Sequence, residues 1–225
     1  QLGEQPSKVF NVGGMGIESI KRLKLLSKIE FEKSIKFKLN KKNIIVTFHP
    51  STLDNQSSKK QFKELLDAIK DLKDTNIIFT KTNSDTGGKE INKMIDFYTS
   101  QNHENSIGII SLGHLRYLSA LQYVDVVVGN SSSGILEAPS FKIGTINIGN
   151  RQEGRIKAKS VVDCKAKKKD IKKSLNKIYS KSFQNMLSTV KNPYDNGLSS
   201  KKILKQLKKI KLDNILKKNF FDIRF

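Results

Sequence analysis

Residues 129–137, with the sequence GNSSSGILE, have the composition of a phosphate-binding turn between a strand and a helix. They follow an apolar run at 126–128 and lead into a helical pattern, so unbonded backbone N–H groups and the positive end of a helix dipole would face an anion. Ser131 and Ser132 could donate hydroxyl hydrogen bonds to the same anion, and Glu137 could accept from a ribose diol. An ordinary serine N-cap with a structural glycine explains these residues equally well.

His49 ends another apolar run, at 43–48, and is followed by Pro50, which stops regular structure. An imidazole at that place could donate to a phosphate or take part in proton transfer. A lone histidine is more often a hydrogen-bonded structural side chain, and that alternative stays open here. His103, in a polar loop, and His114, at the start of a predicted helix, are weaker candidates.

Two more polar segments follow apolar runs. Residues 82–90 include Asn83, which suits a diphosphate or sugar contact as well as it suits a turn. Residues 147–155 carry Arg151 and Arg155 between glycines, and forked guanidinium donors in such a loop fit a diphosphate. The alternative for the second segment is a surface charge pair.

Apolar runs alternate with amphipathic stretches along most of the chain, which predicts alternating strands and helices. We expect strands at 8–12, 43–48, 76–80, 106–110, 125–129 and 145–148, and helices at 16–27, 58–72, 89–99, 114–122, 133–141 and 199–217. The uniformly apolar runs 44–46 and 126–128 indicate a parallel sheet covered on both faces. The predicted fold class is therefore α/β, a Rossmann-like doubly wound parallel sheet, whose ligands bind beyond the carboxyl ends of the strands.

The same pattern predicts three divisions of the chain. Residues 1–40 would form an approach strand, a helix and a mobile, lysine-rich connection. Residues 41–198 would form the Rossmann-like domain, and residues 199–225 a helix with a lysine-rich tail. The apolar stripe of that last helix needs to be covered by a missing domain or a partner. Because the chain begins without methionine on a polar loop, we expect a fragment or a truncated gene product.

Composition narrows the class of protein. The net charge of +21 would suit nucleic acid or an anionic surface. The lysines are spread over predicted helix faces, however, without an aromatic-interleaved basic motif or zinc-ligand spacing. We therefore expect no nucleic-acid partner, no metal and no cofactor; residues 13–16, GGMG, also depart from the GxGxxG of NAD sites. No apolar run approaches the roughly 20 residues that span a bilayer. The single Cys164 favours a reducing, cytoplasmic setting without a membrane partner.

Five segments in a fixed order carry a family resemblance. They are HPST at 49–52, TNSDTGGKE at 82–90, SLGHLRYLSAL at 111–121, GNSSSGILEAPSF at 129–141 and NIGNRQEGR at 147–155. In this order they resemble the hydrolysing UDP-N-acetylglucosamine 2-epimerases, including enzymes that act on N,N'-diacetylbacillosamine nucleotides in legionaminic acid synthesis. The resemblance covers nearly the whole chain, except the tail after about Ile210.

The resemblance implies a GT-B-like enzyme of two Rossmann-like domains, of which this chain is the C-terminal, UDP-binding one. The missing N-terminal domain would supply carboxylates for proton transfer at the sugar, so the chain alone is expected to be inactive. The implied catalytic residue is His49, on the phosphate side. The implied UDP-binding residues are Ser131 and Ser132 at the diphosphate, Glu137 at the ribose, Arg151 at the nucleotide or diphosphate, Asn83 as a weaker contact, and Leu115 with the backbone from Leu112 at the uracil.

The implied reaction eliminates UDP across C1 and C2 of the sugar, and water then adds to a glycal-like intermediate to give the free 2-epimerised sugar. The sequence leaves open whether the nucleotide is UDP or GDP and whether the sugar is N-acetylglucosamine or diacetylbacillosamine. It also leaves the oligomeric state open, with a homodimer or higher oligomer among the alternatives. A GT-B UDP-sugar glycosyltransferase and a non-catalytic nucleotide-sugar-binding fragment are the alternative functions. The loop at 147–155 favours the epimerase.

Overall fold

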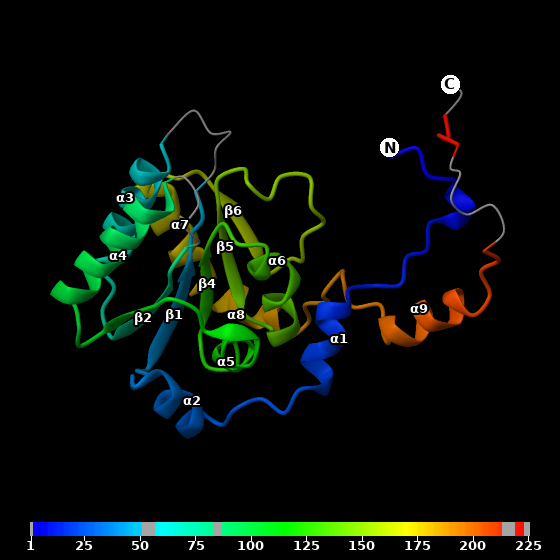
Figure 1. Cartoon of the computed structure of the whole chain (residues 1–225). Coiled ribbons are helices and arrows are strands. Elements are labelled where there is room, and N and C mark those ends of the chain that lie inside the picture. The colour runs from blue at the N-terminus through cyan, green and yellow to red at the C-terminus, as the bar shows by residue number, and fades with distance from the viewer. Residues whose placement is uncertain (1, 51–56, 83–86, 213–218, 223–225) are drawn as a thin grey trace. The chain divides into compact units, whose positions relative to one another are not determined.

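The computed structural model describes residues 2–50, 57–82, 87–212 and 219–222 of the 225-residue chain. These residues form two compact units, one of residues 1–22 with 194–225 and the other of residues 23–193. The larger unit contains the β-sheet and is the part drawn with labelled strands in Figure 1. The expected divisions at residues 40 and 198 stay a prediction.

The sheet of the larger unit has six parallel strands in the order β3-β2-β1-β4-β5-β6. The strands are β1 (Lys42–Thr47), β2 (Thr75–Thr80), β3 (Ser106–Ile109), β4 (Val126–Gly129), β5 (Gly144–Ile148) and β6 (Val161–Cys164). This is the strand order of doubly wound Rossmann sheets, and it reverses between β1 and β4, where such sheets bind ligands. The predicted fold class is confirmed.

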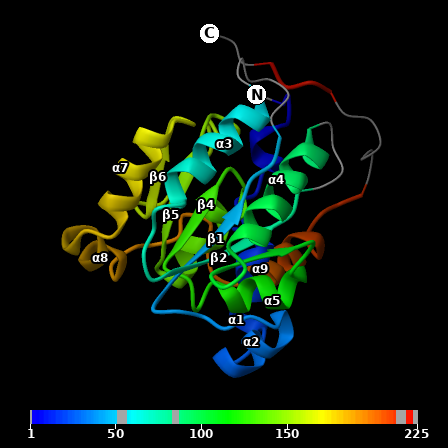
Figure 2. The same ribbon diagram turned by 90° about the vertical axis from the view of Figure 1, so that its left-hand side faces the viewer.

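Helices cover both faces of this sheet. On one face α3 (Ser58–Ile69) packs against α4 (Gly88–Gln101) and α7 (Lys168–Ile178), and Figure 2 shows these three in front of the sheet. The other face carries α5 (Gly113–Ala120) and the short α6 (Ser133–Leu136). Right-handed crossovers between parallel strands require this two-sided arrangement. Completing the unit are α2 (Lys28–Ile35), α8 (Lys181–Leu187) and the 3₁₀ helix η2 (Ala138–Phe141).

The core of the larger unit lies between the sheet and the α3–α4–α7 layer. Strand β1 is buried on both faces from its second residue to its last, and β2 is buried throughout. Phe62 of α3 packs its ring against Phe48 and Phe79, with ring centroids 5.6 Å and 6.5 Å apart. Such pairs add to the stabilisation that comes from apolar burial alone. They fix α3 over the strands that end at the candidate site.

Two expectations for the first 42 residues are wrong. Residues 8–12 form no strand: the 3₁₀ helix η1 (Pro6–Lys8) precedes an irregular stretch in which Val9 and Phe10 are exposed. The lysine-rich connection is not mobile coil, because α2 begins there on a capping box, in which Ser27 Oγ accepts from the Glu30 N–H and the Glu30 carboxylate accepts from the Ser27 N–H. Its Phe31 is fully buried.

Two later expectations also need correction. The helix predicted at 133–141 ends at Leu136 and continues as η2, since Pro139 has no N–H to donate within a helix. Strand β6 was not expected, because its short apolar run at an edge of the sheet gives little signal. The helix expected at 199–217 ends at Leu207, and residues 213–217 of that span lie outside the described residues. The remaining expected strands and helices occur with ends shifted by up to five residues.

The smaller unit pairs the two ends of the chain. Helix α1 (Met15–Arg22) contacts α9 (Ser199–Leu207), and the Glu18 carboxylate accepts from the N–H and hydroxyl of Ser200, each at 2.7 Å. That carboxylate satisfies N–H donors at the start of α9, and these bonds hold the pKa of Glu18 below its ordinary value. The apolar stripe predicted for this helix stays exposed at Leu204, Leu207 and Ile210.

Gly129 is the last residue of β4 and has a φ of +137°. A Cβ placed there would lie 1.9 Å from the Thr47 carbonyl oxygen, a backbone atom that cannot move aside. Gly129→Ala should therefore lower the free energy of unfolding by about 4 kcal/mol or more, measured by urea denaturation.

Gly113→Ala is the matched control for that substitution. Gly113 also has a positive φ, +63°, but a Cβ there meets nothing within 4 Å. Its cost should be only the 1–2 kcal/mol, approximately, of a left-handed alanine. Equal losses for the two variants would show that contact with Thr47 does not constrain position 129.

Candidate functional site

A pocket of about 320 Å³ lies at the carboxyl edge of the sheet, beside the ends of β1, β2 and β4. It brings together three residues that the sequence singled out in two segments, His49 from one and Ser131 and Glu137 from the other. Leu112, Gly113 and His114, from the start of α5, complete one wall. The switch between β1 and β4 therefore carries a concave, mixed polar and apolar site at the place expected for this fold.

The turn after β4 is both a helix cap and a source of donors. Ser131 Oγ accepts from the Ser133 N–H at 3.4 Å, as a capping serine does, while the Ser132 side chain makes no capping bond. Helix α6 has only four residues, so its dipole is much smaller than the longer predicted helix would have had. Attraction of an anion to this turn consequently depends on individual N–H and O–H groups.

Tyr117 of α5 lines the same pocket and accepts a short hydrogen bond from the Ser133 hydroxyl. Burial raises the pKa of the Tyr117 phenol above its ordinary value. The nearby Glu137 carboxylate raises that pKa further, while the bond from Ser133 opposes the shift. The phenol is therefore a neutral group that orients the Ser133 hydroxyl, next to the turn of serines.

His49 is held by both its backbone and its ring. Its N–H donates to Asn130 Oδ1 at 2.7 Å, and its carbonyl accepts from Asn130 Nδ2 at 2.8 Å. Its Nδ1 lies 3.1 Å from Thr82 Oγ1. Below it, the hydroxyls of Thr47 and Thr80 form a buried hydrogen bond of 2.6 Å. The ring is thus a fixed part of the pocket wall and also a hydrogen-bonded residue of the fold.

Two side chains of the loop after β5 form hydrogen bonds with the backbone carbonyl oxygen of Asn130, next to the serine turn. The Asn130 carbonyl accepts from Arg151 Nη1 at 3.0 Å and from Gln152 Nε2 at 2.9 Å. Gln152 is buried, and its Oε1 has no hydrogen-bond partner in the part of the chain that the structure describes. The guanidinium of Arg151 therefore stays next to the serine turn, although it does not line the pocket.

Three described residues that the sequence predicted, Ser132, Leu115 and Arg151, do not line the pocket. Ser132 is in the turn, and Leu115 is an exposed residue of α5 between the lining residues His114 and Tyr117. Asn83 lies outside the described residues.

Four residues at this site were not anticipated: Thr47, Thr80, Tyr117 and Asn130. Three of them, Thr47, Thr80 and Asn130, are polar residues at or just after the end of a buried strand, and that position could have identified them from the sequence.

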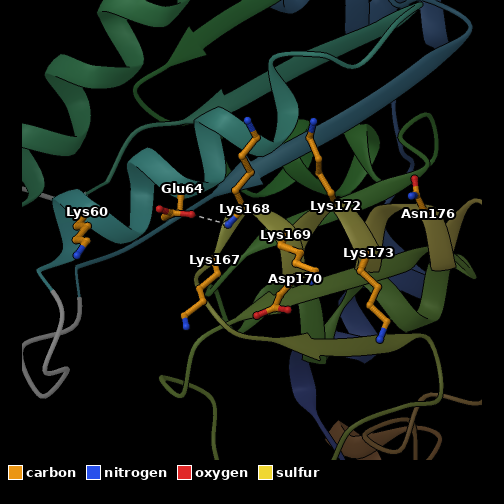
Figure 3. Close-up of a pocket in the computed structure, with 9 residues that line it drawn as sticks. All are labelled: Lys60, Glu64, Lys167, Lys168, Lys169, Asp170, Lys172, Lys173 and Asn176. Atoms are coloured by element: carbon orange, nitrogen blue, oxygen red, sulfur yellow. Dashed lines mark hydrogen bonds between the residues drawn. The ribbon is translucent and has the colours of Figure 1, made fainter.

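A second, larger groove is lined mainly by lysines. It has a volume of about 1120 Å³ and lies between α3 and α7, where Figure 3 shows the lysines of α7 beside Glu64. The Glu64 carboxylate accepts from the Lys168 N–H at 2.6 Å, so the start of α7 already has an anionic partner. Its lining contains no histidine and no hydroxyl group. We therefore assign the candidate site to the smaller pocket.

Neither a metal cluster nor a membrane span emerges from the part of the chain that the structure describes. No three histidine, cysteine, aspartate or glutamate side chains gather there as ligands. None of the described helices has the length and apolar character needed to cross a bilayer.

Comparison with known proteins decides the family. The family model for UDP-N-acetylglucosamine 2-epimerase matches residues 1–208. The chain belongs to this family. Over 224 residues it is 40% identical to the Campylobacter jejuni GDP/UDP-N,N'-diacetylbacillosamine 2-epimerase (hydrolyzing), covering 99% of this chain and 58% of that protein. Over 228 residues it is 38% identical to the Escherichia coli polysialic acid biosynthesis protein P7, and the match covers 99% of this chain and 57% of that protein. This epimerase-family chain thus spans less than two thirds of the length of these relatives.

Solved structures agree in fold. The Methanocaldococcus jannaschii UDP-GlcNAc 2-epimerase in complex with UDP-GlcNAc and UDP superposes with a TM-score of 0.70 at 18% identity, over 92% of this chain and 56% of that one. The S. aureus MnaA–UDP structure superposes with a TM-score of 0.68 at 19% identity, over 92% and 54%. Because both sequence identities are below 20%, these superpositions show only that the chain shares the fold of those structures.

The raised pKa of Tyr117 gives a test of the pocket's environment. A tyrosine ordinarily ionises near pH 10, and Tyr117 should remain protonated when the folded protein is brought to about pH 11. Tyr117→Phe should therefore leave the phenolate absorbance at that pH unchanged. A lower absorbance in the variant would show that Tyr117 ionises with the ordinary tyrosines and is not shielded.

Proposed function

We propose that this chain is the nucleotide-binding part of a hydrolysing sugar-nucleotide 2-epimerase. The observation that supports this most is the meeting of His49, Ser131 and Glu137 in one pocket at the strand-order switch. These residues come from two segments of the family pattern, 49–52 and 129–141, and their shared pocket supports a shared ligand. Family membership supports a nucleotide sugar as that ligand.

Each group then has a role that follows from its chemistry. The N–H groups and hydroxyls of the turn at Ser131 and Ser132 bind the diphosphate, and the Arg151 guanidinium lies close enough to share its charge. Glu137 accepts from the ribose hydroxyls. His49 contacts the phosphate side and assists catalysis. The uracil lies against the start of α5, at Leu112 to Leu115, and Asn83 is a further contact to the diphosphate or sugar.

These donors favour the reaction because they stabilise charge that develops on the leaving group. A base takes the C2 proton as the bond from C1 to the UDP oxygen breaks, which leaves a glycal-like C1=C2 double bond. Water then adds its oxygen to C1, and C2 receives a proton on the opposite face. Preorganised N–H and O–H donors at the departing diphosphate lower the barrier for the first step. The base belongs to the part of the protein beyond this chain.

We propose N-acetylglucosamine or N,N'-diacetylbacillosamine nucleotides as substrates and UDP or GDP as the leaving group. We propose a role in the synthesis of sialic or legionaminic acid, in the cytoplasm; the name of the E. coli relative, a polysialic acid biosynthesis protein, supports the sialic acid pathway. We also propose that the active protein is a homodimer or higher oligomer. A GT-B glycosyltransferase is less well supported, because the family match spans most of the chain.

Two substitutions test the nucleotide site. Arg151→Ala and Glu137→Ala should each weaken UDP binding by about 1–3 kcal/mol, the range for a lost charge-assisted hydrogen bond. Titration calorimetry measures this directly. Arg155→Ala and Glu153→Ala are matched controls, since both residues are exposed in the same loop as Arg151. Equal UDP affinity in the site variants and the controls would remove Arg151 and Glu137 from the site.

The function itself is tested by the products formed from UDP-N-acetylglucosamine without any acceptor. This chain alone should bind UDP yet release no UDP from the nucleotide sugar, because the proton-transfer base is elsewhere. A longer protein that includes it should produce UDP and a free 2-epimerised hexosamine. UDP release that requires an added acceptor sugar would favour the glycosyltransferase, and turnover by this chain alone would contradict the division of roles.

A further inference from the structure

Asn130 holds the backbone of His49 by an amide bridge. Its Oδ1 accepts from the His49 N–H at 2.7 Å and its Nδ2 donates to the His49 carbonyl at 2.8 Å. The regular ladder between β1 and β4 ends two residues earlier, where Thr47 pairs with Gly129. Asn130 is buried, and buried backbone groups need hydrogen-bond partners. Beyond the end of the sheet, its side-chain amide supplies the partners that a neighbouring strand would otherwise give to the His49 N–H and C=O. The position of His49 thus depends on a side chain 81 residues away.

Asn92 makes the same bridge to a second residue. Its Oδ1 accepts from the Thr82 N–H at 2.9 Å, and its Nδ2 donates to the Thr82 carbonyl at 3.0 Å. Asn92 belongs to α4, and Thr82 follows the end of β2 and is buried. An asparagine amide is the side chain suited to this bond pair, because it offers one acceptor and a donor that can face a backbone N–H and C=O together.

The two bridges meet at the imidazole. Thr82 Oγ1 lies 3.1 Å from His49 Nδ1, so one asparagine sets the backbone of His49 and the other sets the partner of its ring. An imidazole that donates to a phosphate or moves a proton needs a defined ring orientation and a defined tautomer. The contact with Thr82 at Nδ1 restricts the ring orientation, whereas the threonine hydroxyl can donate or accept and so fits either tautomer.

We propose that Asn92 and Asn130 are positioning residues that set the orientation of the His49 imidazole, Asn130 through the His49 backbone and Asn92 through Thr82. Neither asparagine needs to touch the substrate. The relevance of this pair to catalysis rests on the proposed function, whereas the hydrogen-bond relay itself does not. Asn92 is therefore a functional residue on α4, a helix that contributes no residue to the wall of the candidate pocket.

The test uses Asn→Asp substitutions, which keep the acceptor oxygen and replace the donor by a second oxygen that repels the bridged carbonyl. Asn92→Asp and Asn130→Asp are compared with Asn43→Asp. Asn43 is buried like Asn130, whereas Asn92 is half-buried. Asn43 donates through Nδ2 to the carbonyls of Asn40 and Tyr123, at the opposite edge of the sheet. This control loses comparable bonds and stability at a place remote from His49.

The first readout is the set of imidazole ¹⁵N resonances of His49, recorded without nucleotide near pH 8, where an imidazole is ordinarily neutral. The chain has three histidines, so assignment is tractable. Asn92→Asp and Asn130→Asp should shift these resonances, because the contact between Nδ1 and Thr82 Oγ1 is displaced, and Asn43→Asp should not. Thr82→Val should reproduce the shift, while Thr82→Ser, which keeps the hydroxyl, should restore the native spectrum.

The second readout is UDP affinity, which should fall about two- to twelvefold in Asn92→Asp, as for one lost hydrogen bond, and stay within about twofold in Asn43→Asp. Unchanged His49 resonances in folded Asn92→Asp and Thr82→Val would overturn the proposal. An equal shift in Asn43→Asp would overturn it as well. If the unsubstituted chain fails to bind UDP, the proposed function fails, and the ¹⁵N spectra still decide the relay. If Asn130→Asp does not fold, Asn92→Asp and the Thr82 variants carry the test.

Discussion

The close contact between Gly129 and the Thr47 carbonyl is the constraint on which the candidate site depends. A Cβ at position 129 would lie 1.9 Å from that oxygen, so only glycine lets β4 end directly beside β1. The next N–H, from Asn130, then donates to the same carbonyl at 3.2 Å. From this one position the Asn130 side chain reaches His49, and its carbonyl reaches Arg151. Two segments, at 47–49 and at Arg151, are therefore fixed to the single residue Asn130.

The binding of an anion at the candidate site depends on the groups that line the pocket, and not on the net charge of the chain. A net charge of +21 gives the chain a general attraction for anions but does not choose where one binds. The lysine-lined groove between α3 and α7 has more cations than the candidate pocket, and yet its helix start is occupied by Glu64. The candidate pocket instead offers neutral hydroxyls and N–H groups with fixed directions, with Arg151 nearby. Fixed donors suit a leaving diphosphate because they need no reorganisation when its charge develops.

Much of this arrangement was predictable, because strand ends in a parallel sheet converge on one edge. The apolar runs around Ile44 and Val126 gave the central strands, and the polar residues after them gave His49 and Ser131. Long-range contacts could not be predicted from local pattern, and nothing in the sequence around Asn130 indicates that its amide bridges the backbone of His49, 81 residues away. Helix α2 was missed for a related reason, since the burial of Phe31 depends on Tyr123, 92 positions along the chain, whose ring centroid lies 6.1 Å from its own.

The measurement that tests the central claim most directly is the map of backbone amide resonances that change when UDP is added to the ¹⁵N-labelled chain. The account predicts that the largest changes occur at Ser131 to Ser133, at the start of α5 from Leu112, and at His49. Residues of α7 from Lys168 to Lys173 should change little. The largest changes along α7, with the serine turn unaffected, would contradict the account and place the nucleotide in the lysine-lined groove.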